Sequence, residues 1–532
     1  MGQRIRLFAV ALVSLIFFGG GVLAQKKEKV DAKANSTKRL KLPGSTKSDV
    51  KLVGDVVFTF LKRDATIESD SAYYFKRRGV MECYGDIVIH EGDSVTITGD
   101  FLIYDQRQRL AKVRDNVIMD NKKSRLYTDN LDYNILNESA SYFKGGRIVD
   151  DVNDLTSQRG YYNTVTRMLS VGGDVVFVNP DYTLETDSMI YDMNTKIATT
   201  IGYTKVTRSI DNMISESPEG GTYNAGADIL EFVNGTIKTE SYELEGVKLY
   251  YDKANSVYRA KGDVRLFSIK ENIIITGDEA VLDKRVGISK VYGGRPVMRK
   301  IFPQDTFYLR ADTLESIDQG EGGRKELLAY HNTVIYKSDV QGLADSLSYH
   351  ISDSLIYLFD EPVLWNGGNQ ITADSINILI GKAGAKRMDA RKNSFVVMQD
   401  SLGNFNQLKG RDMTAYLNGE GIEHIDVNGN SESLFYALEE KKDELIGLNK
   451  LICSDMKITF KDGSPDIIRF YQKPEGKLIP PHEIEEPDTR LKGFSWLDAE
   501  RPFLKDHLPV KPTIKPGDLE KAKKKNAPVK LE

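Results

Sequence analysis

The chain has 532 residues, which is enough for more than one ordinary domain, because single hydrophobic cores stop growing at about 250 to 300 residues. Its 73 Lys and Arg residues against 77 Asp and Glu residues give a formal net charge of −4. No basic excess is available for counterion release, so nucleic acid is excluded as an expected partner. Two cysteines, Cys83 and Cys453, are too few for a disulfide framework, and we expect both to be buried apolar side chains.

Residues 1–24 have the three parts of a secretory signal peptide. Two arginines precede an apolar run over residues 7–18, and Ala24 ends a cleavage motif of small or tolerated residues. The apolar run is short for a helix that spans a membrane, which needs about 20 residues, although an uncleaved anchor stays an alternative. Residues 25–47 are rich in Lys, Ser and Thr without an apolar period, which predicts a flexible leader.

Short stretches of alternating apolar and polar residues follow, separated by Gly, Asp and Asn, and this pattern is typical of strands and turns. A first element recurs in them: a Gly-Asp or related turn, then an apolar triplet. It begins at Gly54, Gly85, Asp115, Gly173 and Gly262, with weaker copies at Asn332 and Glu361. The starts at 54, 85 and 115 are 31 and 30 residues apart. Such self-similarity predicts a repeat body in which each unit buries its apolar face against its neighbours.

A second element interleaves with the first: an Asp, an apolar residue two positions on, and a Tyr four positions on. It begins at Asp70, Asp100, Asp129, Asp187 and Asp345, and a copy with Ile in place of Tyr begins at Asp374. Such Asp and Tyr residues could bind sugar. However, Asp at a strand entrance caps a turn, and Tyr suits a half-buried sheet surface, so we favour a structural role. Each repeat then carries two strands and two turns.

Within the first element, residues two positions apart share one face of a strand. Arg265 lies between Val264 and Leu266 and indicates that the intervening face is wet. The apolar face forms either a plain core or, if two sheets do not close over it, a trough that suits acyl chains. The trough-lining residues predicted from this parity are Val56, Phe58, Ile87, Ile89, Val117, Met119, Val175 and Phe177, with the opposite strand face as the alternative lining where both faces are apolar. A charge at Phe58 or Ile89 is expected to abolish lipid capture and to leave the strand content intact.

The repeats become irregular towards the polar stretch 320–324, so we expect two repeat blocks, residues 48–300 and 301–470. Residues 471–532 hold nine of the 16 prolines and several lysines, which predicts an extended or disordered tail. Its apolar cluster, residues 491–497, is expected to dock onto the body or onto a partner, and the body is favoured.

No catalytic or metal site and no cofactor is predicted. The six histidines lack metal-ligand spacing, and the chain contains no Cys-x-x-Cys, Gly-x-Ser-x-Gly or Walker-type motif. Two alternatives stay open. One is an exported parallel β-helix that binds or degrades polysaccharide, although such repeats are usually shorter. The other is an outer-membrane β-protein, although the charged strands here fit a lipid-facing apolar band poorly.

The elements at 54–74 and 173–191 read Gly-Asp-Val-x-Phe and Asp-Ser-x-x-Tyr and follow an expected signal peptide. They resemble the OstA-like family, the LptA-type proteins of lipopolysaccharide transport, well over residues 48–300 and more loosely over 301–470. The resemblance implies an all-β fold, a stacked antiparallel β-jellyroll with two sheets and open ends. It also implies that the acyl chains of lipid A lie between the sheets.

The same resemblance implies a location and partners. It implies a non-catalytic periplasmic carrier that moves lipopolysaccharide between the inner and outer membranes. The implied partners are lipopolysaccharide, an inner-membrane export complex and outer-membrane lipopolysaccharide assembly proteins. Open sheet edges can add strands from another molecule, so head-to-tail self-association is a further expectation.

Overall fold

The computed structural model describes residues 29–40, 49–302, 305–320, 322–381, 384–418, 421–439, 444–461 and 464–503. The signal peptide expected over residues 1–24 lies outside these ranges. The described chain consists of antiparallel β-strands with three short 3-10 helices, so the all-β fold predicted from the sequence is confirmed. Within these ranges, no helix has the length and apolar character needed to cross a membrane.

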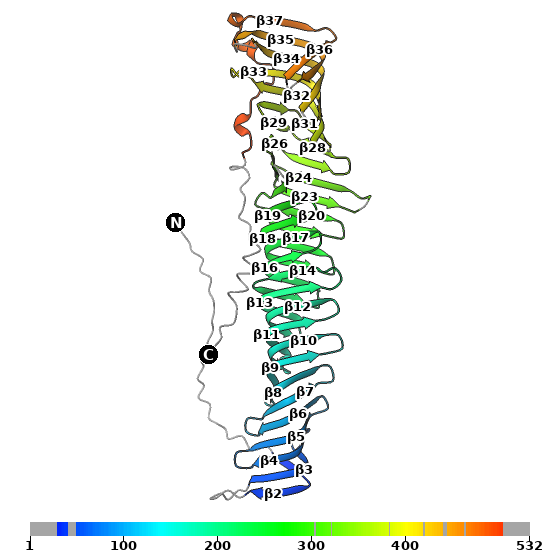
Figure 1. Ribbon diagram of the computed structural model, residues 1–532, viewed down its shortest axis with the longest axis vertical. Coiled ribbons are helices and arrows are strands. Elements are labelled where there is room, and N and C mark those ends of the chain that lie inside the picture. Colours follow the sequence, from blue (N-terminus) through cyan, green and yellow to red (C-terminus); the bar gives the residue numbers. More distant parts are fainter. Residues whose placement is uncertain are drawn as a thin grey trace, which may run out of the picture. The chain divides into compact units, whose positions relative to one another are not determined.

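The chain divides into two compact units, and Figure 1 labels their strands. Unit 1 comprises residues 1–151 and 159–166, and unit 2 comprises residues 152–158 and 167–532. The boundary expected from the sequence near residue 300 stays a prediction. The strands of unit 1 are β1 (Val30–Lys33), β2 (Ser36–Leu40), β3 (Asp49–Phe60), β4 (Ala65–Phe75), β5 (Val80–Glu91), β6 (Val95–Asp105), β7 (Leu110–Asp120), β8 (Arg125–Asn134) and β9 (Ser139–Val149). Strand β10 (Asp154–Asn163) has residues in both units.

Unit 2 holds the remaining elements. Its strands are β11 (Met168–Val178), β12 (Tyr182–Asp192), β13 (Ile197–Arg208), β14 (Ile214–Ser217), β15 (Gly220–Asn224), β16 (Ile229–Lys238), β17 (Tyr242–Asp252), β18 (Val257–Ser268), β19 (Ile273–Asp283), β20 (Ile288–Tyr292), β21 (Val297–Ile301), β22 (Thr306–Arg310), β23 (Thr313–Asp318), β24 (Lys325–Tyr330), β25 (Thr333–Tyr336), β26 (Val340–Ala344), β27 (Ser346–His350), β28 (Leu355–Phe359), β29 (Val363–Asn366), β30 (Asn369–Thr372), β31 (Ser375–Gly381), β32 (Gly384–Gln399), β33 (Phe405–Asn418), β34 (Gly421–Leu438), β35 (Leu445–Lys461), β36 (Ser464–Tyr471) and β37 (Glu475–Ile479). The 3-10 helices η1 (Pro481–Glu483), η2 (Glu486–Thr489) and η3 (Asp498–Glu500) follow.

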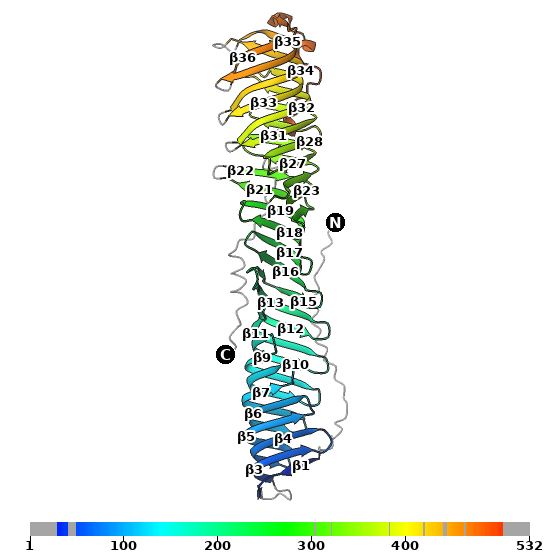
Figure 2. The same cartoon turned by 90° about the vertical axis from the view of Figure 1, so that its right-hand side faces the viewer.

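Long strands in both units are bent near their middle, so that the two halves of one strand belong to different layers (Figure 2). In β3 the bend is made by Gly54 and Asp55, whose φ angles are +78° and +46°. Gly, Asp and Asn tolerate this left-handed backbone best. The pairing with β4 resumes only at Val56, so the bend is also a β-bulge, a feature that bends a strand and strengthens its twist.

In unit 1 we call the layer that contains Leu52 the A layer and the layer that contains Phe58 the B layer; in unit 2 the A layer contains Leu169 and the B layer contains Val175. In unit 1 the A layer holds residues 49–53, 71–75, 80–84, 101–105 and 110–114, and the B layer holds 56–60, 65–69, 87–91, 95–98 and 117–120. In unit 2 some bent strands are divided into separate halves. The A-layer halves are β15, β20, β23, β24, β27, β28, β31 and β36, and the B-layer halves are β14, β21, β22, β25, β26, β29, β30 and β37.

The Gly-Asp pairs expected to form turns before strands lie instead inside strands, at the bends. Gly85 and Asp86, for example, are residues of β5, with φ angles of +76° and +38°. A bend and a turn need the same residue types, because both need positive φ. What distinguishes a bend is an apolar pattern on both sides of the pair, such as Met81 and Cys83 before it and Ile87 after it.

The Asp residues of the second element also lie at bends rather than at strand entrances. Asp100 accepts a hydrogen bond of 2.6 Å from Nδ2 of Asn116, a residue at the bend of the neighbouring strand. Nδ2 of Asn393 donates in the same way to Asp374 at 2.9 Å. These Asp residues therefore join successive bends.

The two chain ends differ from the sequence-based expectation of a flexible leader and an extended or disordered tail. Strands β1 and β2 lie within residues 25–47 and pair with the two halves of β3. Strand pairing needs only backbone groups, so the absence of an apolar period did not prevent it. Tyr471 ends β36, residues 475–503 contain β37 and the three 3-10 helices, and only residues 504–532 of the expected tail lie outside the described residues.

Both cysteines are buried, as the composition predicts, and the structure shows both as free thiols. Burial raises the pKa of the Cys83 thiol to about 12, and it also raises the pKa of Cys453. The thiolate is the reactive form, so we expect neither cysteine of the native chain to react with Ellman's reagent at pH 8. In urea, two thiols per chain should react. Rapid reaction of either thiol in the native chain would show that the layers open to solvent at that point.

Candidate functional site

All eight trough-lining residues predicted from the sequence lie on the inner face of the B layer of their own unit. Six lie in unit 1 on β3, β5 and β7, and Val175 and Phe177 lie in unit 2 on β11. Seven are buried, from Phe58 at 0% exposed to Met119 at 7%, and Phe177 is partly exposed. These seven side chains are shielded from solvent, so this face is part of the core in this structure. Whether it binds lipid stays a prediction.

The opposite inner face, that of the A layer, is supplied by the second sequence element. Its apolar and Tyr positions point inward: Ala72, Leu102, Tyr104, Leu131 and Tyr133 are buried, and Tyr74 is half-buried. The rings of Phe58 and Tyr74 meet edge to face with their centroids 6.3 Å apart, which joins the two layers. The Tyr residues thus contribute to the interior, in agreement with the structural role favoured from the sequence.

We call the strand ends opposite the bends the rim. In unit 1, Phe60 of the B layer and Tyr104 of the A layer meet there, with ring centroids 5.4 Å apart. Arg63 follows β3; its guanidinium lies 4.2 Å from the centroid of the Phe60 ring, and its Nη1 lies 3.1 Å from a carboxylate oxygen of Glu91. Nη2 of Arg63 donates to the Tyr104 hydroxyl at 3.4 Å. A cation therefore bridges both layers over an apolar interior.

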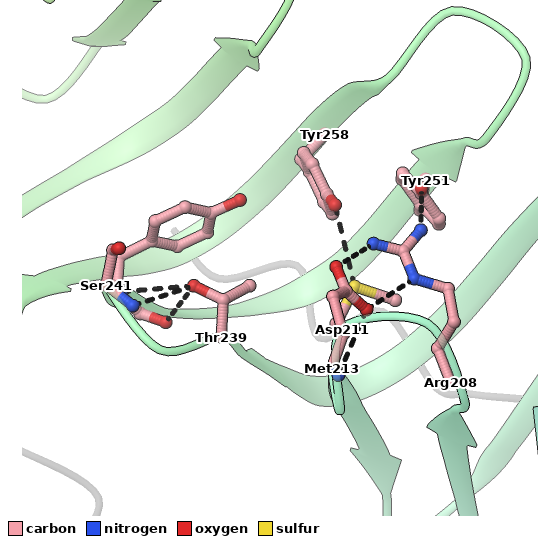
Figure 3. Close-up of polar contacts among 8 residues, drawn as sticks. Arg208, Asp211, Met213, Thr239, Ser241, Tyr251 and Tyr258 are labelled. Carbon is pink, nitrogen blue, oxygen red and sulfur yellow. Dashed lines mark hydrogen bonds and ion pairs between the residues drawn. The ribbon is translucent and has the colours of Figure 1, made fainter. Parts of the chain in front are cut away.

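The rim of unit 2 repeats this arrangement (Figure 3). Arg208, the last residue of β13, donates to the Tyr251 hydroxyl of the A layer and forms an ion pair with Asp211. The rings of Tyr251 and Tyr258 stack with centroids 4.4 Å apart. Nζ of Lys284 lies 5.1 Å from the centroid of the Tyr258 ring. Burial lowers the pKa of Lys284, whereas the Arg208 contact lowers the pKa of Asp211.

Arg265 lies on the outer face of the B layer, as its parity predicts, because its neighbours Val264 and Leu266 are buried inside. Its Nη1 lies 2.9 Å from a carboxylate oxygen of Glu245 on the neighbouring strand. Burial is the main cause of the raised pKa of Glu245. Among the described residues, no group of three or more His, Cys, Asp or Glu side chains could hold a metal ion.

The family model described as OstA-like protein matches residues 27–187 and 161–246, which include the repeats with the strongest Gly-Asp elements. Residues 27–246 belong to the OstA-like family. The resemblance predicted from the sequence is thereby confirmed for this OstA-like region. No curated protein matches the chain.

Solved structures that are similar to part of the chain include LptH. It is described as the LptA homologous periplasmic component of the conserved lipopolysaccharide transport device from Pseudomonas aeruginosa. The two chains are 15% identical, the match covers 26% of this chain and 83% of LptH, and the TM-score is 0.15.

The rims of unit 1 and unit 2 were not predicted from the sequence. Arg63, Arg208 and Lys284 lie in or beside turns, where a basic residue is ordinary, and nothing local marks them as bridges between layers. The partner of Arg208, Tyr251, lies 43 residues away. A usable signal was the Tyr at the fifth position of the second element, because a Tyr at a strand end can keep its hydroxyl at the surface.

Proposed function

We propose that this protein is a non-catalytic periplasmic carrier of lipopolysaccharide, with the acyl chains held between the A and B layers. The observation that carries the proposal is the inner surface, which in each unit is largely apolar on both layers, with buried hydroxyl side chains such as Thr186 and Thr204 lying near the bends. Membership of residues 27–246 in the OstA-like family supports it. An acyl chain is the ligand that such a largely apolar surface suits, because an acyl chain has no polar group to satisfy.

In the proposed mechanism the layers part at the rim. The bends link the layers covalently on one side, whereas side-chain contacts such as those of Arg63 and Arg208 link them on the other. Acyl chains would replace the contacts between the two inner faces. The Arg, Lys and Tyr side chains of the rim would then face the polar part of the lipid.

Photocrosslinking tests this proposal. A light-activated phenylalanine derivative at Phe177, which is inward and partly exposed, is expected to give a lipopolysaccharide adduct. The matched control is Val176, the next residue of β11, whose side chain points outward. A second pair is Ile89 with its neighbour Val88. Equal adducts at inward and outward positions, or none in a folded chain, would contradict the proposal and favour a protein that acts on polysaccharide.

The sheet end in unit 2 supports a proposal for assembly. Strands β36 and β37 each pair with β35, in the A and B layers respectively. Ile467 and Leu478 on these strands are exposed. A strand from a second copy, from an inner-membrane export complex or from an outer-membrane assembly protein could extend either layer there.

A further inference from the structure

The chain after β37 lies across the outer face of the B layer in unit 2, beside β26 and β29 in Figure 1. We call residues 486–501 the strap. It contacts four B-layer strands in turn: Asp488 contacts Lys450 of β35, Leu491 contacts Gln407 of β33, Leu497 contacts Gln370 of β30, and Arg501 contacts Gln341 of β26. The docking expected for the apolar cluster at 491–497 is thereby confirmed.

The surface beneath the strap is one row of paired residues that runs across the strands. The row comprises Gln341, Trp365, Gln370, Val397, Gln407 and Leu434, and all six are buried. Outer sheet faces are normally solvated in antiparallel sheets. Burial of three glutamines on such a face therefore requires a cover.

Two of these glutamines bind the strap through its backbone. Nε2 of Gln407 donates to the carbonyl oxygen of Thr489 at 2.8 Å, and its Oε1 accepts from the amide of Leu491 at 2.8 Å. Gln370 repeats the pattern six residues on. It donates to the carbonyl oxygen of Ser495 at 2.9 Å and accepts from the amide of Leu497 at 2.7 Å. Each side-chain amide thus takes the place of a peptide group in a neighbouring strand.

Aromatic contacts hold the strap between Gln407 and Gln370, and charged contacts hold it at its two ends. The ring of Phe405 lies 5.4 Å from that of Phe494 and 5.2 Å from that of Trp496, measured between centroids. Nε of Arg501 donates to Oε1 of Gln341 at 2.7 Å. Nζ of Lys450 lies 2.7 Å from a carboxylate oxygen of Asp488, and this contact lowers the pKa of that carboxyl group.

The glutamines recognise an extended backbone and not particular side chains. A carbonyl oxygen and an amide two residues apart point to the same side of an extended chain, and one glutamine amide can satisfy both. Buried amides need their partners, so the face and an extended peptide are complementary in hydrogen bonding. Recognition of this kind, with aromatic anchors for specificity, is how sheets bind peptides.

We propose that this outer face of the B layer is a binding site for an extended peptide, and that the strap is its built-in ligand. The ligand is held by non-covalent contacts and by a single connection to β37, at Pro480. The same sequence supplied as a separate peptide therefore replaces the strap when the strap's own anchors are weakened. This inference does not depend on lipid binding.

The test uses the full chain with Phe494→Ala and Trp496→Ala, which weaken the strap and leave the face intact. A fluorescent synthetic peptide of residues 484–503 with the natural sequence is expected to bind this variant at least tenfold more tightly than it binds the wild type. Amide hydrogen exchange at Leu491 and Leu497 should be at least tenfold faster in the variant without peptide. Peptide binding should slow amide hydrogen exchange in the B-layer strands β30 and β33 of the variant.

The matched control adds Gln370→Ala and Gln407→Ala to the weakened chain, and the peptide should then bind at least tenfold more weakly. Equal binding with and without the glutamines would overturn the proposal. It would also be overturned if the strap amides of the weakened chain exchange quickly and the peptide does not bind. Slow exchange at Leu491 and Leu497 in the Phe494→Ala and Trp496→Ala variant would show that the two rings do not anchor the strap. That result would also contradict the proposal. If the weakened chain does not fold, excess peptide added to the wild type decides, since it should accelerate exchange at Leu491 and Leu497.

Discussion

Replacing Phe58 with Asp is expected to unfold unit 1. Phe58 is 0% exposed, and its ring contacts that of Tyr74 across the two layers. Loss of a buried Phe ring alone costs about 3 to 5 kcal/mol, and an unpaired buried carboxylate adds several kcal/mol. The sum is comparable with the whole stability of a domain, about 5 to 15 kcal/mol. Far-UV circular dichroism and hydrogen exchange over β3–β5 measure the outcome.

The matched control for Phe58→Asp is Thr59→Asp. Thr59 is the next residue of β3, it is exposed, and it pairs with Thr66 on the outer face. This control should change the urea midpoint little. The prediction replaces the sequence-based expectation that a charge at Phe58 spares the strand content. Slow exchange over β3–β5 in Phe58→Asp would show that the space between the layers admits a charged group, which would favour the proposed ligand site over a plain core.

Gly220→Ala is expected to destabilise unit 2 strongly, because two separate effects act at this bend. Gly220 begins β15 with a φ of +90°, and a Cβ built on it would lie 2.4 Å from the backbone oxygen of Thr200. Left-handed backbone costs a side chain about 1 to 2 kcal/mol, and steric overpacking costs about 1 to 3 kcal/mol. We therefore expect a loss of about 2 to 5 kcal/mol in the free energy of unfolding, measured by urea titration.

Gly145→Ala separates these two effects. Gly145 also has positive φ, +105°, but a Cβ there would meet no atom within 4 Å. Only the backbone term of about 1 to 2 kcal/mol is then expected. If both variants lose the same free energy, the close approach to Thr200 has no energetic consequence, and the bend at β14–β15 is looser than the structure indicates.

Much of the fold could be predicted from the sequence, because side-chain parity is a local property. Val56, Phe58, Ile87 and Ile89 were assigned to one face by their spacing of two, and they do share the inner face. The positions of the bends were also visible as Gly-Asp pairs. Whether a Gly-Asp pair forms a turn or a bend within a strand could not be predicted, because both need a positive φ.

The rim and the strap could not be predicted, because both depend on residues far apart in the chain. Arg208 and Tyr251 are separated by 43 residues, and Arg501 and Gln341 by 160. A lone Gln on the outer face of a strand is ordinarily a solvated residue. Gln370 and Gln407 differ only because a distant segment covers them, and sequence periodicity contains no information about such a cover.

The bent strand has a consequence for how such a chain can change in length. Each bent strand contributes one half to the A layer and one half to the B layer. A duplicated pair of strands therefore lengthens both layers by the same amount. The inner surface is then lengthened on both layers together. Insertion or loss of whole strand pairs should therefore be tolerated far better than insertion of a single strand, which would reverse the chain direction for every strand after it.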